Sequence, residues 1–191
     1  MNSEQNIQAW QVLHRRQVVD ASPWLCLWVE TIRLPDGRII DDYYTLDMPD
    51  FVVIVALTPS SDLLAERFYR HGPRRVVLSL PAGYIKEGEA PLIAAQRELA
   101  EETGYTGGDW QALGVFTVDG NRGAGSAHIF LARGVEPGTP LDNDDLEERQ
   151  VLLMPLQEFL GAIQSGEVRG LVSMGSFLLA YTHLAQGVPH V

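Results

Sequence analysis

The stretch that decides the fold is GYIKEGEAPLIAAQRELAEETGY, residues 83–105. It begins as a glycine-containing loop and continues over residues 90–103 with a pattern of helical periodicity. Pro91 suits the first turn of a helix, and Gly104 suits the left-handed position just beyond the last turn. The stretch therefore predicts a loop followed by a helix whose two ends both have a chemical explanation.

The predicted helix is amphipathic. One stripe carries Leu92, Gln96 and Leu99. The other stripe carries three carboxylates, from Glu98, Glu101 and Glu102. At about 100° per residue, Glu102 lies roughly 40° from Glu98, and Glu101 lies roughly 60° to the other side. Three acidic side chains therefore share one helix face.

Like charges at these spacings destabilise a helix by a few tenths of a kcal/mol per pair unless a counter-ion sits among them. Carboxylate oxygens suit a hard divalent cation such as magnesium or manganese. An isolated Glu-rich face would usually be solvated. Here it occurs with four further residues at fixed offsets, namely Gly83, Glu89, Arg97 and Gly104. A chance match of this kind has a probability of about one in ten million, which favours the metal-binding interpretation.

These residues match the Nudix box at every specified position, with Tyr105 as the final apolar residue. The chain therefore resembles the Nudix hydrolases. The resemblance implies an α/β fold, a Nudix-type α/β/α sandwich with a mixed sheet. It also implies an enzyme in which water attacks a phosphorus of a nucleoside diphosphate linked to another group, with bound Mg²⁺ and with Mn²⁺ as the alternative.

The resemblance also assigns roles to individual residues. Glu98 and Glu102 correspond to the principal metal ligands, and Glu101 to a third ligand or a base. The carbonyl of Ala82 corresponds to a further metal ligand. Arg97 corresponds to the residue that orients the glutamates. Bound metal would let an acidic chain hold a polyphosphate, because the ion reverses the local field.

Outside the box, the chain is most similar to the ADP-ribose pyrophosphatase group, through the runs RFYR, ending at Arg70, and LPAG, ending at Gly83. By this resemblance Arg70 helps hold the substrate, as suits an arginine facing phosphate, and the alternative is an ordinary arginine at the end of a strand. Arg122 lies in a glycine-rich loop that either lines the substrate site or is a tight connection. Trp24 and Trp28 either stack on a nucleobase or pack in the core or a dimer interface.

An acidic residue in a later loop can be the catalytic base in this group, and Glu147 aligns best with it. Glu101 and Glu148 compete for that role. Two departures from the group are Ser79, where a glutamate is typical, and Gly120, where a proline is frequent. The expected substrate is thus ADP-ribose or a related nucleoside diphosphate sugar. GDP-mannose and NADH stay open as substrates, and a non-catalytic nucleotide-sensing domain is the alternative function.

The remainder of the chain predicts strands and two more helices. Short runs of β-branched and aromatic residues before residue 70 predict a β-meander, with a hairpin turn at LPDGR, residues 34–38. Residues 1–50 are expected to form an N-terminal segment at the interface of a homodimer, and residues 51–191 the Nudix hydrolase domain. Helices are expected over residues 156–164 and 171–184, the latter with a stripe of Leu171, Met174, Leu178 and Tyr181.

Composition limits the classes of partner. The chain has 191 residues and a net charge of -11, so nonspecific coating of nucleic acid is not expected. Cys26 is the single cysteine, which excludes an intramolecular disulfide and fits a reducing cytoplasm. No signal peptide or membrane-spanning run is evident. The sequence therefore predicts a soluble cytoplasmic enzyme that acts on a small nucleotide-linked molecule.

Overall fold

The computed structural model describes residues 7–138 and 148–186. The chain divides into two compact units. The first contains the described residues of Met1–Pro49 together with Thr117–Ser126, and the second contains those of Asp50–Phe116 and Ala127–Val191. The segment 117–126 thus belongs with the N-terminal strands, although it connects two strands of the second unit. The domain limits at residue 50 stay a prediction.

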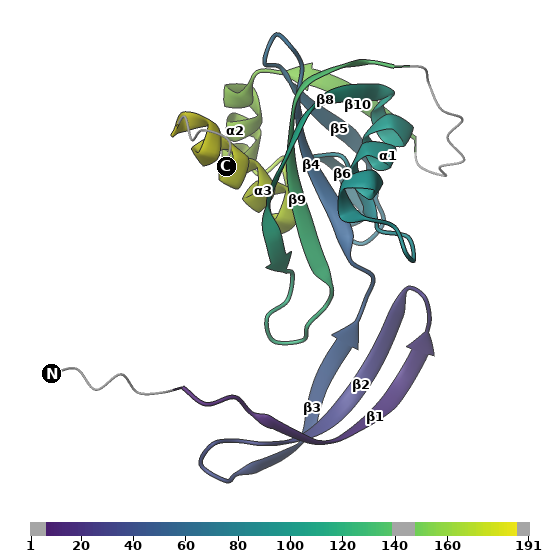
Figure 1. Cartoon of the computed structure of the whole chain (residues 1–191), viewed down its shortest axis with the longest axis vertical. Coiled ribbons are helices and arrows are strands. Elements are labelled where there is room, and N and C mark those ends of the chain that lie inside the picture. Colours follow the sequence, from purple (N-terminus) through teal and green to yellow (C-terminus); the bar gives the residue numbers. More distant parts are fainter. Residues whose placement is uncertain (1–6, 139–147, 187–191) are drawn as a thin grey trace, which may run out of the picture. The chain divides into compact units, whose positions relative to one another are not determined.

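The first unit is an antiparallel sheet of three strands in the order β1-β2-β3 (Figure 1). The strands are β1 (Gln11–Ala21), β2 (Leu25–Arg33) and β3 (Ile39–Asp47). The turn between β2 and β3 is closed by the Leu34 amide, which donates to the Arg38 carbonyl at 2.8 Å. Gly37 adopts φ 87° there, a conformation that favours glycine. The predicted meander and its hairpin are confirmed.

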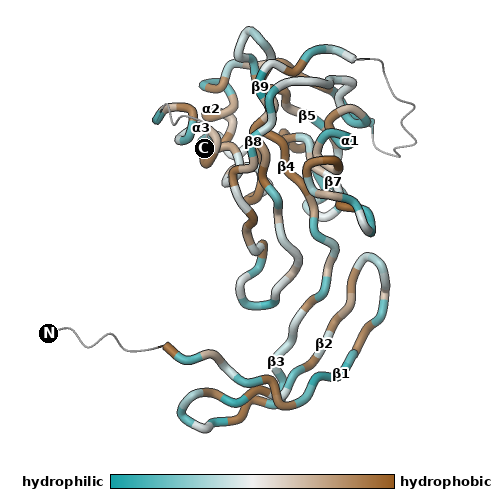
Figure 2. The backbone as a smooth tube through the Cα atoms, in the orientation of Figure 1, coloured by the Kyte–Doolittle hydropathy of each residue, from teal (hydrophilic) through white to brown (hydrophobic). Residues whose placement is uncertain are grey.

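This three-stranded sheet has little core of its own. Every residue of β1 is exposed, and in β2 only Ile32 is buried. Hydropathy varies from residue to residue along β1–β3, whereas β4 in the second unit is hydrophobic along its length (Figure 2). A sheet of this kind gains little stability from burial within one chain.

The second unit is built on a seven-stranded mixed sheet. Five strands follow the order β10-β5-β4-β9-β8, while β6 pairs with β5 and β7 pairs with β4. β4 and β9 run parallel, and β5 runs antiparallel to both β4 and β10. The strands are β4 (Phe51–Leu57), β5 (Leu63–Arg70), β6 (Arg75–Ser79), β7 (Ala82–Tyr84), β8 (Tyr105–Thr117), β9 (Ser126–Pro137) and β10 (Arg149–Met154).

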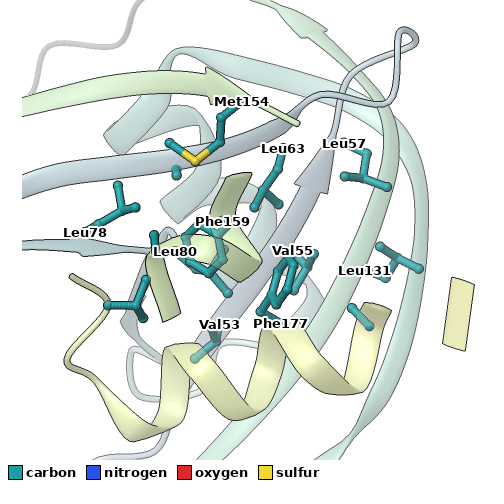
Figure 3. Close-up of a cluster of buried hydrophobic side chains, with 14 residues drawn as sticks. Val53, Val55, Leu57, Leu63, Leu78, Leu80, Leu131, Met154, Phe159 and Phe177 are labelled. Atoms are coloured by element: carbon teal, nitrogen blue, oxygen red, sulfur yellow. The ribbon is translucent and has the colours of Figure 1, made fainter. Parts of the chain in front are cut away.

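Helices cover both faces of this sheet (Figure 1). They are α1 (Pro91–Thr103), α2 (Leu156–Ser165) and α3 (Leu171–Ala185). Val53 and Val55 of β4 pack with Phe159 of α2 and Phe177 of α3 (Figure 3). The alternate residues of the same strand, including Ile54, pack in a second cluster with α1. The predicted α/β/α sandwich is confirmed, and β4 reads as continuously apolar because both of its faces are buried.

The helix boundaries agree with the sequence, and the predicted stripes are confirmed in part. Gly104 caps α1 at φ 74°, as expected. Leu92 of the predicted stripe is 39% exposed and Gln96 is exposed, because α1 packs through alanines and Leu99. In α3 the buried residues are Ser173, Ser176, Phe177 and Ala180. Of the predicted stripe, Met174 and Tyr181 pack against the core, whereas Leu171 and Leu178 are exposed. No helix within residues 7–138 and 148–186 is long and apolar enough to span a membrane.

Candidate active site

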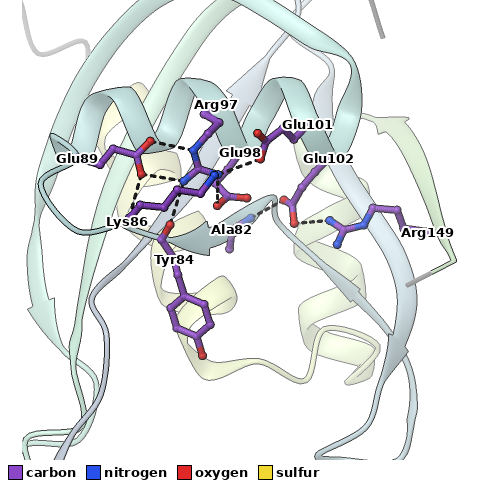
Figure 4. Close-up of polar contacts among 9 residues, drawn as sticks. All are labelled: Ala82, Tyr84, Lys86, Glu89, Arg97, Glu98, Glu101, Glu102 and Arg149. Carbon is purple, nitrogen blue, oxygen red and sulfur yellow. Dashed lines mark hydrogen bonds and ion pairs between the residues drawn. The ribbon is translucent and has the colours of Figure 1, made fainter. Parts of the chain in front are cut away.

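The loop that precedes α1 is fixed to the sheet at its start. β7 pairs antiparallel with β4, so that Ala82 lies opposite Val53 and Tyr84 opposite Phe51. The Ile85 amide then donates to the Asp50 carbonyl at 3.0 Å. These bonds place the N-terminal end of the quoted motif beside α1, as Figure 4 shows.

Arg97 is the centre of the polar network (Figure 4). Its Nε and Nη2 donate to the two carboxylate oxygens of Glu89 at 2.8 and 2.9 Å. Its Nη1 donates to Glu98 at 2.7 Å and to Glu101 at 2.9 Å, and Nη2 also donates to the Tyr84 carbonyl. The hydrogen bonds from Arg97 lower the pKa of Glu89 to about 2, and those carboxylates raise the pKa of Arg97. Arg97 therefore holds the side chains of Glu89, Glu98 and Glu101 by hydrogen bonds, and its role in orienting the glutamates, which the resemblance implies, stays a prediction.

Glu98 lies against the backbone of Gly83. A Cβ atom added at Gly83 would be 2.0 Å from the Glu98 carboxyl carbon, so a larger residue would displace that carboxylate. The Glu98 side chain is 14% exposed, and burial raises its pKa although Arg97 opposes the effect. Gly83 therefore forms a cradle for one of the three carboxylates.

Glu102 is the most buried of the three. Its Oε2 accepts a hydrogen bond from the Ala82 amide at 2.9 Å, and its Oε1 forms an ion pair with Arg149. Arg149 also donates to both carboxylate oxygens of Glu66 at 3.3 Å. Burial and the charge of Glu66 raise the pKa of Glu102, while Arg149 lowers it. Glu66 and Arg149 are residues that sequence reasoning missed.

A signal for Glu66 was present. It stands in β5, in the run LLAERF, where residues 63–66 are all buried. A glutamate at a buried strand position needs a paired charge, since carboxylates are almost never fully buried alone. The sequence alone does not identify the partner, because Arg149 is 83 residues away along the chain.

Arg70 lies on the exposed end of β5. Its guanidinium is 4.4 Å from the centre of the Phe68 ring, and the guanidinium of Arg149 lies over the same ring at 5.3 Å. This ring connects Arg70 with the ion pairs of Glu102. A hollow of about 560 Å³ adjoins this strand end, and Phe68 and the exposed Glu148 are among its lining residues.

The other predicted substrate residues belong to the first unit. Trp24 is 61% exposed at the turn between β1 and β2. Trp28 is partly buried, with the guanidinium of Arg15 4.1 Å from its ring centre. Arg122 forms an ion pair with Asp119 at 2.9 Å. The carboxylates of α1 belong to the second unit, so the proposed roles of these three residues stay predictions. Glu147 lies outside the described residues.

The donor set fits a hard divalent cation. It consists of three carboxylates on one helix face, one of them cradled by Gly83 and one aligned by the Ala82 amide. As the side chains of residues 7–138 and 148–186 are placed, no three His, Cys, Asp or Glu residues form a group that could hold a metal ion. Arg97 and Arg149 instead hold the carboxylates as counter-ions.

Comparisons with known proteins agree with this geometry. The family model of the NUDIX domain matches residues 48–170, and that of the nucleoside diphosphate sugar hydrolase N-terminal domain matches residues 10–46. An ADP-ribose pyrophosphatase of Bacillus subtilis is 30% identical over 74% of this chain and 77% of its own. A methanol dehydrogenase activator of Bacillus methanolicus is 27% identical over 86% and 88%.

A solved structure described as an ADP compounds hydrolase has the same fold. It superimposes with a TM-score of 0.84, covers 96% of this chain and 98% of its own, and is 20% identical. Together with the match of the family model to residues 48–170, these findings show that the chain belongs to the NUDIX domain family and is a Nudix hydrolase of pyrophosphate bonds.

Proposed function

We propose that this protein hydrolyses the diphosphate of ADP-ribose or a related nucleoside diphosphate sugar in a Mg²⁺-dependent reaction, with a nucleoside monophosphate and a sugar phosphate as products. The similarity to an ADP-ribose pyrophosphatase over three quarters of the chain supports this substrate class. The match of residues 10–46 to a nucleoside diphosphate sugar hydrolase N-terminal domain supports it independently. Mn²⁺ is the alternative ion, and GDP-mannose and NADH are the alternative substrates.

Glu98 and Glu102 would hold the ion, with Glu101 and the Ala82 carbonyl as further ligands. A bound divalent ion neutralises charge on the diphosphate and lowers the pKa of water. Arg97 keeps the glutamates on one face of α1, through the bonds to Glu98 and Glu101. Preorganisation of this kind avoids the cost of arranging charges during the reaction.

Substrate binding would involve Arg70 and Arg122 at the phosphates and Trp24 or Trp28 at the base. Arginine suits phosphate because its planar fork donates two parallel hydrogen bonds. Glu147 is the proposed catalytic base, with Glu101 and Glu148 as the competing residues. A base must reach the attacking water, and Glu148, the residue just before β10, is exposed beside the hollow described above.

The observation that carries the proposal is the constrained position of Glu102, whose side chain is 8% exposed and whose two oxygens both have partners. Glu102→Gln removes the charge and keeps the shape, so we expect at least a 100-fold loss of Mg²⁺-dependent product release from ADP-ribose. The control is Glu158→Gln, an exposed glutamate in the first turn of α2, which should keep full activity. Full activity of the Glu102 variant would refute its assignment as a ligand.

The substrate is identified by a panel. Purified protein with Mg²⁺ is incubated with ADP-ribose, GDP-mannose and NADH, and nucleoside monophosphate is measured by chromatography. We expect the largest kcat/KM for ADP-ribose or another nucleoside diphosphate sugar. Inertness toward every compound, combined with nucleotide binding, would favour the sensing function instead.

We also propose a homodimer that involves the N-terminal sheet. The apolar side chains on β1 are exposed, with Val12 at 53%, Val18 at 45% and Val19 at 42%. Such a surface gains stability when a second chain covers it. Light scattering after size-exclusion chromatography should give twice the 21.1 kDa chain mass. A monomeric mass at micromolar concentration would contradict this proposal.

A further inference from the structure

One guanidinium lies between two buried carboxylates in the second unit. Arg149 contacts both oxygens of Glu66 at 3.3 Å and pairs with Oε1 of Glu102. The exposed fractions of the side chains are 9% for Arg149, 1% for Glu66 and 8% for Glu102. The three groups therefore form a triad that is almost completely removed from solvent.

The triad joins three elements that are distant in sequence. Glu66 comes from β5, Arg149 from the first position of β10, and Glu102 from the last turn of α1. β10 and β5 are neighbouring strands, and Val151 lies opposite Glu66 in their register. Arg149 thus reaches from the strand next to Glu66 toward the helix that carries the candidate metal ligands, as Figure 4 shows for its contact with Glu102.

Two contacts hold the Glu102 carboxylate, one at each oxygen. Ala82 occupies one direction at Oε2 and Arg149 one direction at Oε1. A carboxylate has about four lone-pair directions, so two contacts leave directions for a ligand. Arg149 cannot turn away easily, because Glu66 anchors it and the Phe68 ring lies 5.3 Å from it.

We propose that Arg149 is a positioning residue for the hydrolase, with Glu66 as its anchor: it holds the Glu102 carboxylate in the orientation that a divalent ion requires. This inference rests on the proposed role of Glu102 as a metal ligand. Partners that orient metal ligands are typically worth 10–100-fold in metal affinity or activity. Arg149 itself touches neither ion nor substrate in this assignment.

The test measures Mn²⁺ affinity by electron paramagnetic resonance, in the absence of substrate, alongside kcat, KM and the thermal midpoint. In Arg149→Met we expect 10–100-fold weaker Mn²⁺ binding and a similar loss of kcat, with KM within about threefold of the parent. Arg149→Lys keeps the positive charge but not the planar guanidinium whose Nη1 makes these contacts, so its Mn²⁺ affinity should lie between those of the parent and the Met variant. The matched control is Arg133→Met, which removes a partly buried strand arginine bonded to Gln111 and should leave Mn²⁺ affinity unchanged.

The double variant Glu66→Gln with Arg149→Met distinguishes a positioning role of Arg149 from a contribution to stability alone. It removes one buried charge of each sign, so its thermal midpoint should recover toward the parent. Under the proposal, Mn²⁺ affinity stays low in this variant because Glu102 still lacks its partner. Recovery of affinity together with the midpoint would overturn the proposal.

Two further results would also overturn it: Mn²⁺ binding by Arg149→Met within twofold of the parent, or binding tighter than the parent, which would make Arg149 a competitor of the ion. If Arg149→Met does not fold, the Mn²⁺ affinity of Arg149→Lys is used instead, and a value within twofold of the parent would overturn the proposal. Glu102→Gln is measured in parallel. Unchanged Mn²⁺ binding in that variant refutes the proposed function, whereas weak binding there with unchanged binding in the Arg149 variants refutes only the present inference.

Discussion

The substitution Gly83→Ala should reduce the activity of this protein and leave its fold intact. The backbone at Gly83 is not left-handed, so alanine is compatible with its conformation. The added Cβ would lie 2.0 Å from the Glu98 carboxyl carbon, whereas ordinary contact begins at 3.4 Å. The carboxylate must therefore retreat by the difference, about 1.4 Å.

This displacement falls on the end of a flexible side chain, so the fold can accommodate it. The hydrogen bond between Arg97 and Glu98, at 2.7 Å, would be lost, which costs about 2 kcal/mol of unfolding free energy. A misplacement of about 1 Å in an active site can cost about 100-fold in rate. We expect Gly83→Ala to lose roughly 100-fold in kcat while keeping most of its stability.

The assay pairs turnover of the nucleoside diphosphate sugar with urea unfolding. Gly161→Ala is the control, because nothing lies within 4 Å of a Cβ at this position of α2, and alanine should stabilise the helix by roughly 0.5–1 kcal/mol. Activity of Gly83→Ala within threefold of the parent would refute the cradle argument. A loss of stability above about 3 kcal/mol would show that Gly83 is required by the fold instead.

Three further outcomes follow from the packing around α1. Glu89→Gln should destabilise the protein by about 2 kcal/mol in urea, since it breaks the charged pair with Arg97, whose side chain is 18% exposed. The folded-state pKa of Glu89 is lowered from 4.5 to about 2, so the stability that Glu89 contributes should be fully present above pH 5 and should be lost as the pH falls from 5 to 2. In acid titrations, Glu89→Gln should therefore show a smaller decrease of unfolding free energy over this range than the parent. Leu99→Ala, at a fully buried position, should cost roughly 3–5 kcal/mol, and a loss below 1 kcal/mol would contradict the described packing of α1.

The local part of the fold was predictable from the sequence because it depends on local chemistry. Pro91 and Gly104 determine the ends of α1, and the continuous apolar run of β4 corresponds to a strand buried on both faces. The predicted stripe of α1 is confirmed at Leu99, which is buried, and is wrong at Leu92 and Gln96, which are exposed. Ala94 and Ala95 face the sheet instead, and small residues there allow α1 to pack close to β4.

The candidate site was predictable only in the part that one continuous stretch of sequence supplies, from Ala82 through α1. Arg97 and the glutamates of α1 lie within a short stretch, so their spacing alone places them on one face. Arg149 and Glu66 meet through pairing of β10 with β5, a contact that no local pattern encodes.

The sequence does contain one indication of this pairing, which is a glutamate, Glu66, in an otherwise apolar strand. The structure buries Glu66 and also Glu102 at the end of α1, and two carboxylates cannot both be buried as anions without a cation between them. A buried glutamate in an apolar strand is therefore evidence for an unseen arginine or ion, and in this protein the arginine holds the same carboxylate that the ion would require.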